Sequence, residues 1–301
     1  MLSNFCRTFL ALLIGINVWS QSTLLSPSDT LNNKRLIASA IGTGVIWSGS
    51  IIGLSSIWYK DFPKTSFHTF DDSREWMQMD KMGHVFTAYH FSDKVSKLYR
   101  WSGLDRKKSA LIGAGVGWGY QMSFELLDAQ SADWGFSWSD VGANTLGSGL
   151  FLSQELIWQE QYVKLKFSYS PSDFAQYRPS ILGASFSERL LKDYNGQTYW
   201  LTFSPGCIFP KSKIPAWIAI AAGYSVDAKL VGSNDFFQTA DGLKSFTAKR
   251  EFVLSLDLDV TKLPIKKPWL KKVLSPFNVI KIPFPALVFR GNDISRRLLY
   301  F

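Results

Sequence analysis

Residues 35–58 read RLIASAIGTGVIWSGSIIGLSSIW, about 24 residues without a charge after Arg35. A run of this length and composition predicts a helix long enough to cross a membrane, because a bilayer requires about 20 apolar residues. Small residues recur along it, and they would let a neighbouring helix approach closely; they are Gly42, Gly44, Ser48, Gly49 and Gly53. The run therefore predicts a helical, membrane-associated first half of the chain.

Three further apolar segments follow, at residues 80–101, 108–127 and 140–158. Ser137 or Ser139 is a predicted N-cap of the last one. Aromatic and basic residues close several of these segments, which is typical of the headgroup layer of a membrane. The four segments predict a mainly α fold, an antiparallel bundle of about four apolar helices, either embedded in a membrane or, as the alternative, soluble.

The pattern changes near residue 161. Apolar and polar residues alternate over residues 252–261, which predicts a β-strand with Asp257 and Asp259 on its solvated face. Residues 198–203 form a shorter strand candidate. We expect an appended C-terminal region with some β content.

Two segments of this region are ambiguous. Residues 279–289 are extended but contain Pro283 and Pro285, so we place them at the edge of a sheet. Residues 215–224 (PAWIAIAAGY) suit either a helix or a strand. The resulting division is a signal peptide at 1–20, a helical domain at 21–160 and a mixed α/β region at 161–301.

The signal peptide is predicted from a short basic region and a short apolar run. Arg7 precedes residues 8–19 (TFLALLIGINVW), and small residues favour cleavage before Gln21. An uncleaved anchor is the alternative. Cys6 lies ahead of the apolar run, and no cysteine ends the signal, so we expect no lipid attachment.

The charge balance favours lipid over nucleic acid as the partner. The net charge is +9, yet the basic residues are scattered or lie at the ends of apolar runs, with no basic helix and no zinc-ligand spacing. Attraction to anionic headgroups explains the same charge. We expect membrane lipid as a partner and no nucleic acid, and the sequence identifies no protein partner.

The distribution of charge also bears on location. If the four segments are antiparallel, one end collects basic residues: Lys34, Arg35, Arg100, Arg106, Lys107 and Lys108. In an inner-membrane protein such an end faces the cytoplasm, whereas cleavage before Gln21 would leave Lys34 and Arg35 outside. We therefore expect the cell envelope, and the periplasm or outer membrane rather than the inner membrane.

Polar residues recur at helical spacing in the apolar segments. The pairs Asp80 and His84, Gln121 and Glu125, and Asp140 and Asn144 are each four residues apart, so each pair shares one helix face. In an antiparallel arrangement all three pairs lie at the same end. Ionisable groups among apolar helices are costly unless paired, and they mark candidate sites.

Two kinds of chemistry suit this cluster. The candidate catalytic residues are His84, Glu125 and Asp140, with the imidazole as proton carrier. The candidate ligands of a divalent metal are Asp80, His84, Glu125 and Asp140. Supporting roles are expected for Lys81, Gln121, Asn144 and Gly147. The alternative is structural: Asp80 and Asp140 complement helix N-termini, while His84 and Glu125 form hydrogen bonds between helices.

The residues around this cluster carry a family resemblance. The run WMQMDKMGH at 76–84, followed by Thr87-Ala88-Tyr89, and the later pattern at 135–147 (GFSWSDVGANTLG) resemble the signatures of the YfiM-like periplasmic lipoproteins. The order of these elements is more remotely similar to the VanZ-like membrane proteins. The resemblance implies a helical envelope protein of unknown activity and assigns no reaction.

Two functions remain open from the sequence. One is a non-enzymatic envelope protein that packs in or against a membrane and presents the polar cluster at one end. The other is a membrane-site hydrolase or transferase that acts on a lipid-linked or cell-wall substrate through His84, Glu125 and Asp140.

Overall fold

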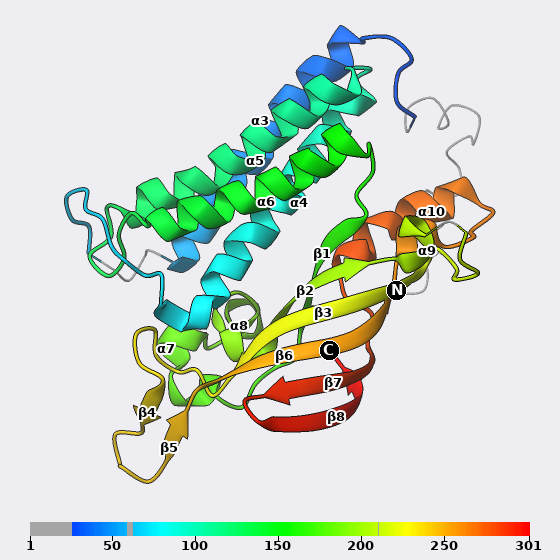
Figure 1. Ribbon diagram of the computed structural model, residues 1–301. Coiled ribbons are helices and arrows are strands. Elements are labelled where there is room, and N and C mark those ends of the chain that lie inside the picture. Colours follow the sequence, from blue (N-terminus) through cyan, green and yellow to red (C-terminus); the bar gives the residue numbers. More distant parts are fainter. Residues whose placement is uncertain (1–25, 59–62, 210) are drawn as a thin grey trace, which may run out of the picture.

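The computed structural model describes residues 26–58, 63–209 and 211–301 (Figure 1). The predicted signal peptide lies outside the described residues. Four long helices lie side by side, and their bounds agree with the predicted segments to within a few residues; they are α3 (Asn33–Trp58), α4 (Met79–Trp101), α5 (Arg106–Asp128) and α6 (Trp138–Ile157).

The second half of the chain forms an antiparallel sheet of six strands beside the helices (Figure 1). In sheet order the strands are β1 (Val163–Tyr169), β2 (Gln197–Phe203), β3 (Ile218–Asp227), β6 (Lys249–Leu258), β7 (Phe284–Arg290) and β8 (Asp293–Tyr300). A separate hairpin joins β4 (Phe236–Gln238) and β5 (Ser245–Thr247). The prediction of a mainly α bundle with an appended region is therefore wrong, and the fold is mixed α/β.

Short helical elements connect these parts: η1 (Glu75–Gln78), η2 (Ala175–Tyr177), α7 (Pro179–Leu182), α8 (Phe186–Lys192), η3 (Tyr194–Gly196), α9 (Pro205–Ile208), η4 (Val260–Lys262), α10 (Pro268–Leu274) and η5 (Ser275–Val279). The ambiguous segment at 215–224 is mostly strand β3. The proline-containing strand β7 is not at the edge, because β8 pairs with it; Pro285 lies where the register shifts between Phe284 and Ala286.

The polarity of the sheet is the reverse of the sequence prediction. In β6 the apolar residues Phe252, Leu254 and Leu256 are exposed, whereas Glu251, Ser255 and Asp257 are buried. The exposed residues continue across the strands, since Leu201, Ala222, Leu254 and Leu287 are paired in one row. Alternation along a strand separates two faces but does not state which face is covered, so the expected solvated position of Asp257 is wrong.

The inner face of the sheet closes on itself. The ring of Trp200 in β2 lies 5.6 Å from that of Tyr300 in β8, and Lys281 N donates to Phe167 O of β1 at 2.9 Å. Inside the curve, Lys166 Nζ lies 2.6 Å from Asp257 Oδ2. Strong curvature thus encloses a core that contains charged side chains.

Helix α4 lies between the other helices and the sheet. Its residue His90 bonds Leu165 O of β1 at 2.8 Å. On its other side it approaches α5 and α6 closely: a Cβ on Gly117 would lie 2.2 Å from Ser92 Oγ, and one on Gly147 would lie 2.2 Å from Val85 O. The expected packing role of Gly147 therefore has a direct geometric basis.

Helix α3 packs on α5 through few contacts and is largely exposed. Trp47 Nε1 donates to Ser123 Oγ at 3.1 Å, and Tyr120 OH donates to Ser50 Oγ at 3.0 Å. Among the described helices it is the one that is long and apolar enough to cross a membrane, and 11% of its most apolar window is buried. Its glycines meet no neighbouring atom within 4 Å, so the expectation that they admit a helix of this chain is wrong for the described residues.

Candidate functional site

A strained turn directly precedes α4, the helix that carries Asp80, Lys81 and His84. Trp76, Met77 and Gln78 have φ values of 50°, 51° and 65°, in the left-handed region that side chains rarely occupy. Such residues cost about 1–3 kcal/mol each and cluster at functional sites. The sheet half holds the turn, because Tyr224 OH donates to Met77 O at 2.5 Å and Arg250 Nη2 donates to Gln78 Oε1 at 2.7 Å.

Lys81 stands at the centre of three carboxylates. Its Nζ lies 2.6 Å from Asp72 Oδ2, 2.8 Å from Asp80 Oδ2 and 2.9 Å from Asp140 Oδ1. Burial alone would lower the pKa of Lys81, but Asp80 and Asp140 raise it above its usual value. Lys81, expected only in support, therefore holds the cluster together as a fixed cation.

Asp72 is the site residue that the sequence analysis missed. Burial tends to raise its pKa, but hydrogen bonds from Lys81 and Ser137 bring the pKa below its usual value. Ser137 Oγ donates to Asp72 Oδ1 at 2.5 Å, as does Ser139 Oγ at 2.8 Å. Ser137 is also the N-cap of α6 and accepts from Asp140 N. Asp72 lies in a loop without helical spacing, so no periodic signal linked it to the helices.

His84 lies where the three predicted pairs converge. Its Nδ1 is 3.0 Å from Asn144 Oδ1 and 3.1 Å from Gln121 Nε2, and its Nε2 is 3.8 Å from Asp140 Oδ1. When Nδ1 carries the proton and donates to Asn144, Nε2 keeps its lone pair. The structure thus brings together the predicted residues of α4, α5 and α6.

Glu125 is fully buried below His84. Its Oε1 lies 3.7 Å from His84 Nδ1 and accepts no hydrogen bond from the described residues. Burial, and then the charge of Asp140, raises the pKa of Glu125 to about 9. Burial also raises the pKa of Asp140 to about 6, against the opposing effect of His84. At neutral pH the site therefore contains a protonated carboxyl group beside an imidazole.

Two sets of three side chains have the spacing of metal ligands. One set is Asp72, Asp80 and Asp140, and the other is His84, Glu125 and Asp140; in each, the ligand atoms lie within 4.8 Å of one another. The Lys81 ammonium already occupies the centre of the first set. The second set has the imidazole and carboxylate donors that divalent transition metals accept, although Glu125 must lose its proton to bind one. Asp80 belongs with Lys81 rather than with His84.

The cluster opens into a cavity of about 280 Å³. His84, Asp80 and Asp140 form its polar wall, and its apolar wall includes Leu54 of α3 and Phe124 of α5. The sheet half also contributes to the lining, through Tyr194 and Tyr199. A cavity that combines an apolar wall, convergent polar groups and perturbed pKa values is the usual form of a ligand site.

The elements that carry the cluster are those that a family model recognises. Residues 69–153 match the family "Predicted periplasmic lipoprotein (DUF2279)". The match supports a location in the periplasm or cell envelope and assigns no activity. The narrower likeness to YfiM-like and VanZ-like proteins stays a prediction. No curated protein and no solved structure matches the chain.

The family region contains every predicted site residue and the newly found Asp72. It ends within α6, before β1 begins. Tyr194 and Tyr199, which complete the cavity, therefore lie outside the matched region. In this chain the sheet half adds a wall to the cavity beside the motifs at 76–84 and 135–147.

Proposed function

We propose that this exported envelope protein packs against a membrane through the outer surfaces of α3, α5 and α6 and uses the His84 cavity as its working site. The observation that carries the proposal is the exposed apolar surface of these helices. It comprises Ile37, Ile41, Val45 and Ile52 of α3, Leu111 and Leu126 of α5, and Leu146 and Ile157 of α6. Large apolar side chains exposed along several neighbouring helices mark membrane or protein contacts.

The sheet supports the same proposal independently. Its outer face exposes Leu201, Phe252, Leu254 and Leu256, while its inner face buries the charged pair of Lys166 and Asp257 next to an apolar cluster around Trp200. Apolar residues outward and polar residues inward are the pattern of a sheet that faces lipid. Both halves thus present apolar side chains on their outer surfaces, and hydrocarbon would cover them.

The proposed location is the periplasm or the outer membrane rather than the inner membrane. Cleavage before Gln21 would release Lys34 and Arg35 on the outer side, where the positive-inside rule does not place basic helix ends. Membrane lipid is the proposed partner.

Membrane fractionation with carbonate extraction tests the packing. We expect the mature chain, beginning at Gln21, to stay in the membrane pellet at high pH. The variant Ile41→Ser/Val45→Ser/Ile52→Ser should shift into the extract. Leu243→Ser is the matched control, because Leu243 is 82% exposed on the loop of the β4–β5 hairpin. Extraction of the unmodified chain, or equal behaviour of the two variants, would contradict the proposal.

A second function is favoured by one observation, the imidazole and protonated carboxyl group that meet beside a cavity with an apolar wall. With Nδ1–H bonded to Asn144, His84 Nε2 is available as a general base, while the protonated Glu125 lies behind the ring, 3.7 Å from Nδ1 and outside the cavity lining. These roles suit a hydrolase or transferase that acts on a lipid-linked or cell-wall substrate.

Conservative variants distinguish this enzyme from a structural cluster. His84→Gln and Glu125→Gln should not lower the melting temperature, yet both should fail to complement an envelope phenotype of the deletion strain. If both chains fail to accumulate, the cluster is structural and the enzyme proposal fails. Added Mn²⁺ or Zn²⁺ should raise the melting temperature of the unmodified chain alone if His84 is a metal ligand.

A further inference from the structure

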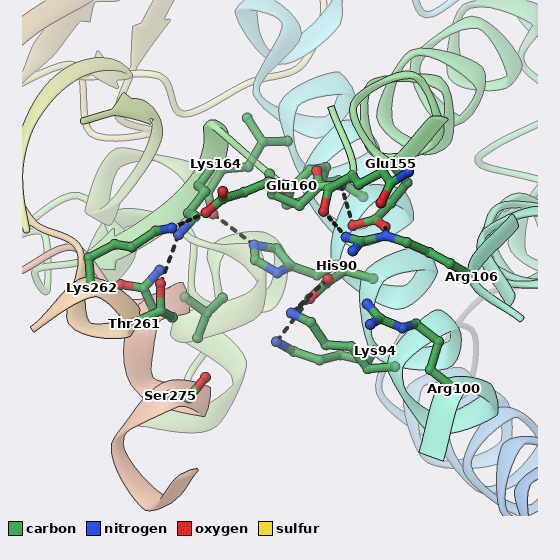
Figure 2. A pocket seen from close by; sticks show the side chains of 18 residues that line it. His90, Lys94, Arg100, Arg106, Glu155, Glu160, Lys164, Thr261, Lys262 and Ser275 are labelled. Atoms are coloured by element: carbon green, nitrogen blue, oxygen red, sulfur yellow. Dashed lines mark hydrogen bonds and ion pairs between the residues drawn. The ribbon is translucent and has the colours of Figure 1, made fainter. Parts of the chain in front are cut away.

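A second cavity, of about 410 Å³, lies at the other end of α4, between the helices and the sheet. Figure 2 shows side chains from α4, α5, β1 and η4 converging on it, with His90 near the middle. Its remaining walls come from the end of α6 and from Ser275, Asn278 and Val279 of η5. The cavity is thus built by both halves of the molecule.

The lining has more cations than carboxylates. Its six basic side chains are Lys94, Lys97, Arg100, Arg106, Lys164 and Lys262, and its three acidic ones are Asp93, Glu155 and Glu160. Each of these carboxylates is already matched by a cation. Glu155 Oε2 lies 2.8 Å from Arg106 Nε, and Glu160 pairs with Lys262. The remaining positive charge therefore has no counter-charge in the lining.

The excess lies on the α4 side of the cavity. Asp93 is shared by two cations, with Lys97 Nζ at 2.8 Å and Lys94 Nζ at 3.3 Å. Arg100, one turn further along, has no carboxylate partner among the residues that the structure describes. Across the cavity Lys164 Nζ is held by Asp259 at 2.5 Å. An unpaired guanidinium beside two half-paired ammonium groups is suited to an incoming anion.

The chain around the cavity strengthens this field. Residues 260–292 contain no acidic residue. Lys266 and Lys267 precede α10, and Lys271 and Lys272 lie within it, immediately before the η5 residues of the cavity wall. Clustered charge of one sign beside a cleft raises the local concentration of counter-ions.

His90 does not supply a titrating charge at this site. Burial, and then Lys94, lowers its pKa to about 4, and its Nε2 donates to Leu165 O at 2.8 Å. The groups that face it include Asp93 and Lys97 as well as Lys94. The positive charge of the cavity therefore comes from its lysine and arginine side chains.

We infer that this cavity binds a phosphate ester, with Arg100, Lys94 and Lys97 as the principal contacts of the phosphate oxygens. Arginine offers paired donors that match phosphate geometry, and lysines add point charge. The volume is within the range of about 300–1,000 Å³ that is usual for small-molecule sites. A lipid headgroup and a soluble phosphate ester share this chemistry. The inference does not depend on the role of His84.

The test uses the purified full-length mature chain and two probes. Isothermal titration calorimetry measures the binding of inorganic phosphate. Vesicle flotation compares binding to phosphatidylcholine vesicles that contain phosphatidylglycerol with binding to vesicles of phosphatidylcholine alone. Arg100→Gln removes a cation that makes no ion pair in the lining, so the fold should persist at an unchanged melting temperature. Lys108→Gln is the control, because its side chain is 72% exposed and does not line the cavity.

We expect Arg100→Gln to weaken binding of at least one probe by about tenfold or more, the loss of one charge-assisted contact, and Lys108→Gln to leave it within about twofold. If Arg100→Gln weakens the binding of inorganic phosphate, a soluble phosphate ester is sufficient as the ligand. Loss confined to phosphatidylglycerol vesicles identifies a lipid headgroup. Failure of both probes to bind the unmodified chain, or equal weakening by the two variants, would overturn the inference.

Discussion

The helical half and the sheet half each bury a cluster of charges, but in opposite proportions. Beside α4, one lysine, Lys81, is surrounded by three carboxylates. Inside the sheet, two lysines, Lys166 and Lys281, lie near one carboxylate, Asp257. Burial raises the pKa of Asp80 and Asp140 in the first cluster and lowers the pKa of Lys166 and Lys281 in the second, and neighbouring groups of like charge add to each shift.

The two clusters also differ in access. Asp80 and Asp140 line the His84 cavity, whereas Lys166, Lys281 and Asp257 line neither of the two cavities described above. Lys281 is instead held by Ser255 Oγ at 3.1 Å and lies over the Trp200 ring. A buried charge cluster indicates a working site only when a ligand can reach it. A sealed cluster holds the fold.

The largest expected effect comes from removing the cation of the helical cluster. Lys81→Met leaves three carboxylates without a neutralising cation, and we expect the free energy of unfolding to fall by about 3–5 kcal/mol. Lys97→Met, at a side chain that is 60% exposed, should cost about 1 kcal/mol or less. Chemical denaturation measures both. Equal losses would show that Lys81 does not hold the cluster.

A smaller effect is expected from Glu125→Gln, and it depends on pH. The folded-state pKa of about 9 lies above the ordinary value of 4.5. The contribution of Glu125 to stability is therefore complete below about pH 4.5 and is lost as the pH rises through 9. At pH 8 the variant should be more stable than the unmodified chain by on the order of 2 kcal/mol. Denaturation curves at pH 5 and pH 8 test this, and an unchanged pH slope would refute it.

The smallest effect, with the opposite sign of slope, belongs to the sheet. Burial lowers the pKa of Lys281 to about 8 from 10.5, so its contribution is present above pH 10.5 and is lost as the pH falls through 8. Between pH 8 and pH 10 the unmodified chain should gain on the order of 1 kcal/mol relative to Lys281→Met. Stability is measured by denaturation of both chains over this interval. Parallel curves would show that Lys281 does not give the sheet cluster a pH dependence opposite to that of the helical cluster.

The four long helices could be predicted from the sequence because each has a long apolar run with recognisable ends. Ser137 illustrates this, since it is one of the two predicted N-caps of α6 and is the one that the structure shows. The same regularity located His84, Glu125 and Asp140, because four-residue spacing places side chains on one helix face. Asp72 and the strained turn at Trp76 lie outside any periodic pattern of residues, so no sequence signal links them to Lys81, and only the folded structure shows that they lie near it.

The sheet was harder to predict for a physical reason. Period-two alternation in β6 identified the strand, but the direction of burial depends on what surrounds the sheet. The curvature that encloses Asp257 arises from pairing across six strands, which no local window contains. Strand β8 is almost wholly exposed, so burial left no alternating signal in its sequence.

The outward apolar faces of both halves are expected to contact lipid. Nitroxide labels on Ile41→Cys, Leu254→Cys and Leu243→Cys, each in a Cys207→Ser background and reconstituted in vesicles, test it by spin-label collision measurements. We expect labels at positions 41 and 254 to collide readily with oxygen and rarely with a water-soluble nickel complex, and the label at position 243 to do the reverse. Nickel-accessible labels at both 41 and 254 would contradict it.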